Sequence, residues 1–366
     1  MRVLQIIQKC QLRGAEVFAC QLSDELNKGN NVVDIVYLFD TGVSLPFSLK
    51  FTSLHGNIKR RFWDFPAYKR LANIIADGNY DLVQANACDT LKYAVLSKRI
   101  FKWKTPIIFR NANKMSAFFK GIWHHKFNRW LLSHCHYIIS VSENCRRDII
   151  SIFPQAQASS ETITIGTYDF SDVIPRPLTN ERPVIINIGS LVPEKNQSFL
   201  IDVFKTFKQK NNGTLIVVGE GKLREYLENK VRVEGLTGQI IFTGATTDVI
   251  PLLKSADLLL LTSKIEGLPG VILESLSCGV PVISSDVGGI PEIISDGHTG
   301  FLIRDSNVQS YVKKVEECLG NDEIRANLIL NGRTLILSEF LLPKIAAKFL
   351  DAYDKVLNAA IIAKGV

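Results

Sequence analysis

The stretch DLLLLTSKIEGLPGVILESLSCGVPVISSD, residues 257–286, contains an apolar run, a glycine-rich loop, a helical pattern and a second apolar run in succession. Its first six residues (257–262) are almost continuously apolar, and PVISS (281–285) is another short run of the same kind. Short apolar runs separated by a helix are typical of parallel strands covered on both faces. The stretch therefore predicts a doubly wound α/β sheet.

The same alternation recurs along the whole chain. In the second half the other expected strands are 183–189, 214–219 and 239–244. In the first half, where the pattern is less regular, they are 2–7, 31–39, 81–86, 105–110 and 136–142. Both halves are thus expected to contain a parallel sheet.

The length of 366 residues exceeds what one hydrophobic core usually organises, so two domains are expected. The stretch 169–183 is polar, contains three prolines and has the composition of a linker. We expect a first domain over 1–175 and a second over 176–345, with a C-terminal helix at about 346–366 returning to the first.

Composition favours a soluble globular protein, since apolar residues make up 46% and charged residues 22% of the chain. No apolar stretch is long enough to span a bilayer, and residues 1–16 lack the features of a secretory signal. The seven cysteines include no Cys-x-x-Cys pair, which indicates reduced thiols and a cytoplasmic location.

Two glutamates, Glu266 and Glu274, flank the end of the expected strand at 257–262. Ligands in open α/β sheets bind beyond the carboxyl ends of the strands. The loop between the glutamates ends in a helix at about Val271, whose positive terminus and free N–H groups suit a phosphate. The carboxylates suit hydroxyl groups such as the diol of a ribose or sugar. Alternatively, Glu266 caps the loop and Glu274 faces solvent.

Two further turns follow strands in the second half. Lys195 lies between the strand at 183–189 and the helix after it, where an ammonium group can meet phosphate. A Gly-Glu-Gly turn occupies 219–221, and Gly244 would let the backbone approach a flat ring.

These motifs, in this order, resemble glycosyltransferase family 4. They are Gly-x-Leu-x-x-Glu-Lys (189–195), Val-Gly-Glu-Gly (218–221), Phe-x-Gly (242–244), the glutamate pair in 266–294, and DGHTGFLI (296–303). The resemblance implies the GT-B fold, two facing Rossmann-like doubly wound parallel-sheet domains. It also implies a retaining enzyme that uses a nucleotide-diphosphate sugar.

Site residues follow from this resemblance. Glu266 would contact the donor sugar, Glu274 the ribose, and Lys195 the diphosphate together with backbone amides of the loop. The catalytic candidates are Glu266 and Lys195. The candidates for nucleotide-sugar binding are Gly14, Ser190, Gly244, Leu268, Pro269, Gly270, Val271 and Glu274.

The chain departs from the family pattern at Ser190, where many members have Arg. Arg13 or Arg110 could supply the missing cation. The chain contains no Asp-x-Asp pair, so we expect a metal-independent reaction with no cofactor besides the nucleotide-diphosphate sugar. Lys195 and backbone amides would stabilise the negative charge of the diphosphate leaving group.

The net charge of +7 is uneven: residues 1–180 hold 23 Lys and Arg against 14 Asp and Glu, and residues 181–366 hold 20 against 22. In 59–70 and 114–132 the basic residues alternate with aromatics. These stretches are either two helices with solvated basic faces or a surface that contacts an anionic membrane. No nucleic-acid motif accompanies the charge, so nucleic acid is not an expected partner.

The sequence therefore predicts a retaining glycosyltransferase at the inner face of the cell membrane. Its acceptor would be a lipid-linked saccharide or an oligosaccharide in cell-surface polysaccharide synthesis of the O-antigen or capsule type. Three alternatives stay open: a glycoside hydrolase with paired carboxylates, a non-catalytic nucleotide-sugar-binding subunit, and a nucleotide-sugar epimerase of similar architecture.

Overall fold

The structure is a computed structural model that describes residues 1–42, 44–60, 62–119 and 121–362. Arg61 and Lys120 of the basic stretches, and the last four residues of the expected C-terminal helix, lie outside the described residues. The chain forms two compact units, 1–166 with 342–366, and 167–341. These divisions fall at 166/167 and 341/342, whereas the sequence placed them at 175/176 and about 345/346.

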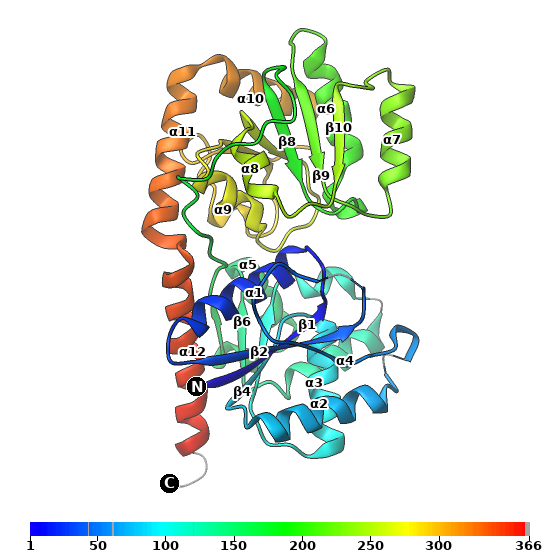
Figure 1. The fold of residues 1–366 in the computed structure, drawn as a ribbon, viewed down its shortest axis with the longest axis vertical. Helices are drawn as coiled ribbons and strands as arrows, with labels where there is room; N and C mark the ends of the chain where they lie inside the picture. The colour runs from blue at the N-terminus through cyan, green and yellow to red at the C-terminus, as the bar shows by residue number, and fades with distance from the viewer. Residues whose placement is uncertain (43, 61, 120, 363–366) are drawn as a thin grey trace. The chain divides into compact units, whose positions relative to one another are not determined.

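Unit 1 contains a seven-stranded parallel sheet in the order β3-β2-β1-β4-β5-β6-β7. Strands β1, β2, β4 and β6 of this sheet are labelled in Figure 1. Its strands are β1 (Arg2–Lys9), β2 (Val32–Phe39), β3 (Phe51–Ser53), β4 (Leu82–Ala85), β5 (Ile107–Asn111), β6 (Tyr137–Ser140) and β7 (Ser160–Thr162). Its helices are α1 (Gly14–Asn27), α2 (Phe65–Gly78), α3 (Cys88–Phe101), α4 (Ile122–Leu132), α5 (Glu143–Ile152) and α12 (Leu342–Ile362), with short turns η1 (Ile58–Arg60), η2 (Met115–Phe118) and η3 (Pro154–Gln157).

Unit 2 contains a six-stranded parallel sheet in the order β10-β9-β8-β11-β12-β13. Its strands are β8 (Val184–Ile188), β9 (Thr214–Val218), β10 (Ile240–Gly244), β11 (Leu258–Leu261), β12 (Val282–Ser285) and β13 (Phe301–Ile303). Its helices are α6 (Gln197–Lys208), α7 (Arg224–Val233), α8 (Val249–Lys254), α9 (Gly270–Ser277), α10 (Val308–Gly320) and α11 (Asp322–Leu335), with turns η4 (Pro193–Lys195), η5 (Ile290–Glu292) and η6 (Ile336–Phe340).

The strand–helix–strand unit predicted at 257–286 is confirmed as β11, α9 and β12. All four residues of β11 are buried, because the strand pairs with β8 on one side and β12 on the other and is covered on both faces. Helix α9 ends at Ser277, and Gly279 follows with φ +71°, the left-handed conformation that closes many helices. Two doubly wound Rossmann-like sheets, as predicted, make up the fold.

The sequence pattern missed two strands of unit 1, β3 and β7. Each has three residues at an edge of the sheet, and most of these residues are only half-buried. Such strands are too short to show either a continuous apolar run or an alternation.

Helix α12 follows unit 2 in the sequence but belongs to unit 1. Its Phe349 ring lies 5.9 Å from Phe18 of α1, and the Tyr353 hydroxyl donates to Gln84 Oε1 on β4 at 2.7 Å. In the part of the chain that the structure describes, no helix combines the length and apolarity needed to cross a bilayer.

Candidate functional site

The loop after β11 is fixed by hydrogen bonds to two neighbouring segments at the carboxyl edge of the sheet of unit 2. Lys264 N donates to Glu194 O at 2.8 Å, which ties the loop to η4. Ser285 Oγ at the end of β12 donates to Ser263 O at 2.7 Å. The loop is therefore held between the ends of β8 and β12.

A glycine turn after β12 packs directly against Glu266. Gly289 N donates to Gly267 O at 2.7 Å. Gly288 has φ +61°, and a Cβ there would lie 2.0 Å from Glu266 O. Only glycine allows this approach, so the turn fixes the backbone of Glu266.

Lys195 and Glu266, the two catalytic candidates, form an ion pair. Lys195 Nζ lies 2.5 Å from Glu266 Oε1, although 71 residues separate them. The Glu266 side chain is 8% exposed and that of Lys195 is 27% exposed. A carboxylate this buried needs a cation to offset its lost hydration, and Lys195 supplies one while keeping its ammonium group at the edge of the sheet.

Helix α9 begins directly after this loop. Pro269 is its N-cap, and no side chain accepts a hydrogen bond from the first turn. The N–H groups of Gly270 and Val271 belong to that turn, where amides have no partner within the helix. Leu268 and Pro269 are buried and anchor the loop, so the first turn is presented at the carboxyl edge as a site for an anion.

Glu274 lies one turn further along α9 and has a different environment. Its carboxyl group is half-buried and makes no hydrogen bond or ion pair with any residue that the structure describes. Burial raises the pKa of Glu274 to about 7. This group therefore changes charge near neutral pH, unlike a carboxylate paired with a lysine.

The remaining candidates of unit 2 lie at the ends of β8, β9 and β10. Ser190 O accepts from Gln197 Nε2 at 3.0 Å, which connects it to α6. Gly244 has φ +78°, and a Cβ there would approach Glu220 Oε1 to 3.0 Å. Glu220 forms an ion pair with Arg224 at 2.6 Å. This charged pair borders Gly244, and the sequence pattern did not single out the pair.

In unit 1, Gly14 opens α1, and a Cβ built on it would meet nothing within 4 Å. Arg13 is exposed just before it. Arg110 differs from both, because its side chain is 1% exposed and its Nε and Nη1 have no hydrogen-bonding partner in the described part of the chain. Its guanidinium lies 4.4 Å from the centre of the Phe18 ring, and burial lowers its pKa to about 10. Arg110 is thus a core residue, contrary to the suggestion that it could face the donor.

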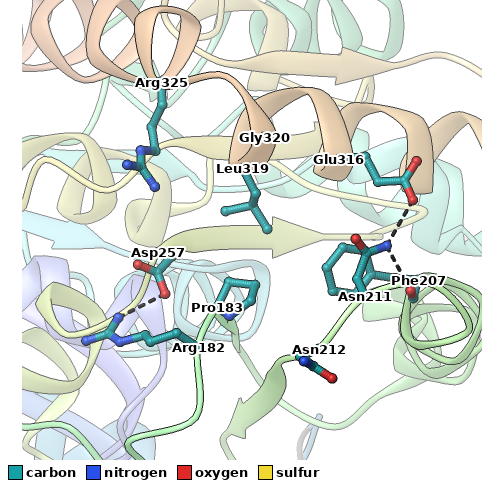
Figure 2. A pocket seen from close by; sticks show the side chains of 10 residues that line it. All are labelled: Arg182, Pro183, Phe207, Asn211, Asn212, Asp257, Glu316, Leu319, Gly320 and Arg325. Atoms are coloured by element: carbon teal, nitrogen blue, oxygen red, sulfur yellow. Dashed lines mark hydrogen bonds and ion pairs between the residues drawn. The ribbon is translucent and has the colours of Figure 1, made fainter.

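A pocket of about 380 Å³ lies elsewhere in unit 2. Figure 2 shows the Arg182–Asp257 ion pair on one side of it and Arg325 above. Pro183 and Asp257 directly precede β8 and β11, so this pocket is at the amino edge of the sheet. It is therefore distinct from the candidate site at the carboxyl edge. Among the described residues there is no group of three or more His, Cys, Asp or Glu placed to hold a metal ion.

Two family models match the chain. "Glycosyl transferases group 1" covers residues 172–335, and "Glycosyltransferase Family 4" covers residues 12–164. The first match lies within unit 2 and the second within unit 1.

Curated relatives agree with these models. An N-acetyl-alpha-D-glucosaminyl L-malate synthase of Bacillus anthracis is 27% identical over 50% of this chain and 48% of its own length, so the match spans about half of that relative. The "GalNAc-alpha-(1->4)-GalNAc-alpha-(1->3)-diNAcBac-PP-undecaprenol alpha-1,4-N-acetyl-D-galactosaminyltransferase" of Campylobacter jejuni is 25% identical over 98% of this chain and 100% of its own.

Solved structures share the fold over the full chain. Sucrose-phosphate synthase from Thermosynechococcus elongatus has a TM-score of 0.84 at 17% identity, covering 98% of this chain and 100% of its own. HepE of Anabaena, solved in complex with UDP-glucose, has a TM-score of 0.83 at 18% identity, covering 97% and 100%. At these identities the likeness concerns the fold alone.

Replacement of Glu274 by Gln should stabilise the protein at alkaline pH. The folded-state pKa of about 7 exceeds the ordinary 4.5, so the native state binds a proton more tightly than the unfolded chain and loses stability as pH rises from 4.5 towards 7. Gln cannot ionise, so Glu274→Gln should melt roughly 2–4 °C above wild type at about pH 8 and close to it at about pH 4.5. Thermal denaturation followed by circular dichroism measures this, and an equal difference at both pH values would contradict the assigned environment.

Replacement of Arg110 by Met should also stabilise the protein. Two nitrogens of the buried guanidinium, Nε and Nη1, have no hydrogen-bonding partner among the described residues. Met of similar length carries no such cost in free energy, so we expect a gain of about 1–3 kcal/mol in the free energy of unfolding. Urea denaturation measures this gain, with Arg129→Met, a change at an exposed arginine of the same unit, as the matched control. Destabilisation by Arg110→Met alone would show that the guanidinium is needed for the native packing.

Proposed function

The chain is a member of glycosyltransferase family 4, and we propose that it is a retaining enzyme that moves a sugar from a nucleotide-diphosphate sugar to a lipid-linked saccharide. The observation that supports this best is the Lys195–Glu266 pair at the carboxyl edge of unit 2, next to the uncapped first turn of α9. The ion pair and the first turn of α9 together present a cation, free N–H groups and carboxylates close to one another at this edge of the sheet.

The diphosphate leaving group would be stabilised by positive groups alone. As the bond from the sugar to the diphosphate breaks, negative charge grows on the phosphate oxygens. The ammonium group of Lys195 and the N–H groups of Gly270 and Val271 would stabilise this charge. We propose that this replaces a divalent cation, so that the reaction is metal-independent.

The two carboxyl groups would bind hydroxyls. Glu266 already accepts a hydrogen bond from Lys195 through Oε1, and its other oxygen would accept from a hydroxyl of the donor sugar. Glu274 has no hydrogen-bonding partner among the described residues. Its ionised carboxylate would accept hydrogen bonds from the hydroxyl groups of the ribose. A donor that binds the ionised form lowers the pKa of Glu274, so donor affinity would rise with pH through about 7.

The acceptor proposal rests on the full-length relative. The name of the Campylobacter enzyme specifies a PP-undecaprenol-linked saccharide, and its alignment covers nearly all of this chain. We carry over the class of acceptor and not the sugar: the transferred group would be a hexose or an N-acetylhexosamine, in bacterial cell-surface polysaccharide or lipopolysaccharide synthesis. A lipid-linked acceptor places the enzyme at the cytoplasmic face of the cell membrane, in peripheral contact with anionic lipid.

Ser190 favours one competing function. Its side chain is a hydroxyl where the family resemblance implies an arginine, which leaves Lys195 as the cation of the motif at 189–195. The chain could then be a non-catalytic subunit that binds a nucleotide sugar. Such a subunit would bind the donor and release no nucleotide diphosphate from it.

Loss of either partner of the ion pair should abolish transfer. We expect Lys195→Ala and Glu266→Gln each to lower kcat by roughly 10²–10³-fold, since each removes a charged group from the donor site. The measurement is release of nucleotide diphosphate from a panel of nucleotide sugars in the presence of bacterial lipid-linked saccharides.

Lys264→Ala is the matched control, because Lys264 is an exposed lysine two residues before Glu266. A wild-type rate in either site variant would refute the assignment. Donor binding by the wild-type protein without any release of nucleotide diphosphate would favour the non-catalytic subunit.

A further inference from the structure

Unit 1 exposes large apolar side chains in two segments. The first runs from η1 into α2 and includes Trp63, which is 73% exposed. The second runs from η2 into α4 and includes Ile122 and Trp123, which are 72% and 82% exposed. Exposed tryptophans are uncommon in a soluble domain, and a group of large apolar side chains on a surface marks an interaction site.

The two segments meet and form one surface, although they are far apart in the sequence. The Phe62 ring lies 5.5 Å from the Phe127 ring at 62° between planes. Lys92 Nζ of α3 lies 4.7 Å from the centre of the same Phe62 ring. We call this the aromatic surface, and its exposed apolar members are Ile58, Phe62, Trp63, Phe65, Phe118, Ile122 and Trp123.

Helix α4 shows why these residues are not part of the core. Its Leu131 and Leu132 are buried in the unit, and its Ile122 and Trp123 at the other end are exposed. The C-terminal end of α4 therefore packs into the hydrophobic core, and its N-terminal end does not. The apolar residues at its start have no partner among the described residues that would cover them.

The two segments that form the aromatic surface carry mainly positive charge. The segments 58–65 and 115–130 contain six lysines and arginines and one acid, Asp64. Asp64 is buried and accepts from the Tyr93 hydroxyl at 2.9 Å, so it does not offset the exposed cations. Lys126 Nζ lies 5.3 Å from the centre of the Trp123 ring, which brings a cation next to the most exposed aromatic.

We propose that the aromatic surface is where unit 1 docks on an anionic lipid bilayer. Trp63, Ile122 and Trp123 enter the boundary between headgroups and acyl chains, where aromatic rings are favoured. Lys59, Arg60 and Lys126 lie among the anionic headgroups. The inference rests on the proposed membrane contact of the enzyme and assigns that contact to particular residues.

A lipid surface fits these features better than another copy of the chain. Two copies meeting through this surface would bring like charges together, which opposes association. An anionic bilayer supplies both an apolar layer for the rings and a negative charge for the cations. The aromatic surface presents both groups side by side, as an interfacial contact requires.

Sedimentation with vesicles of phosphatidylglycerol and phosphatidylethanolamine tests the proposal. We expect wild-type protein to bind them, to bind pure phosphatidylcholine vesicles roughly tenfold less, and to dissociate as salt rises from about 0.1 M to about 0.5 M. The pair Trp63→Ala with Trp123→Ala, and the triple Lys59→Glu, Arg60→Glu and Lys126→Glu, should each weaken binding roughly tenfold or more.

Matched controls come from exposed positions of unit 2. Leu330→Ala with Val233→Ala removes exposed apolar side chains, and the triple Lys210→Glu, Lys222→Glu and Lys313→Glu reverses exposed cations. Both controls should bind vesicles like wild type. As an independent measurement, tryptophan emission of the wild-type protein should shift to the blue on binding and be quenched by lipids brominated on the acyl chain.

Wild-type vesicle binding by both aromatic-surface variants, or no binding by the wild type, overturns the proposal. Light scattering could instead show a dimer of the wild-type protein that the tryptophan variants lose, with vesicle binding unchanged. This outcome would assign the aromatic surface to contact with a second copy of the chain and would also overturn the proposal. A thermal-shift assay with UDP-glucose and other nucleotide sugars measures donor binding, so it tests the proposed function independently of lipid binding. Because the donor site is in unit 2, the variants should keep the donor response of the wild type whether or not they bind lipid.

Discussion

The ion pair between Lys195 and Glu266 is the interaction on which the candidate site depends. It joins the turn after β8 to the loop after β11, and it pairs the buried carboxylate of Glu266 with a cation. The hydrogen bond from Lys264 N to Glu194 O and the close approach of Gly288 fix the same loop from two sides. The first turn of α9 begins where this loop ends.

Two glutamates eight residues apart differ in chemistry because their surroundings differ. Glu266 is buried and compensated by Lys195. Glu274 lies in the helix without a charged or hydrogen-bonding partner among the described residues, and burial raises its pKa to about 7. Glu266 is therefore held in an ion pair, and Glu274 can take up a proton near neutral pH. A polar group without a hydrogen-bonding partner in the protein can form its hydrogen bonds with a bound ligand. Glu274 therefore suits a ligand that carries hydroxyl groups.

The two units have distinct surface chemistry on similar sheets. Unit 2 carries its candidate site residues at the carboxyl edge, after β8, β10 and β11. Unit 1 carries most of the excess positive charge and exposes aromatic side chains beside it. The family match extends over both units, in two separate models.

The sequence by itself determined the doubly wound fold, and it named the candidate site residues. Buried parallel strands must be continuously apolar, and the motifs between them keep fixed spacing, so β8 to β12 could be located from pattern alone. Short edge strands such as β3 and β7 have no pattern to detect. Only the tertiary structure decided that Lys195 meets Glu266, that Arg110 is in the core, and that Phe62 and Phe127 join two aromatic segments into one surface. Each of these depends on which distant segments the sheets bring together, and the local sequence does not encode a distance between residues that are far apart along the chain.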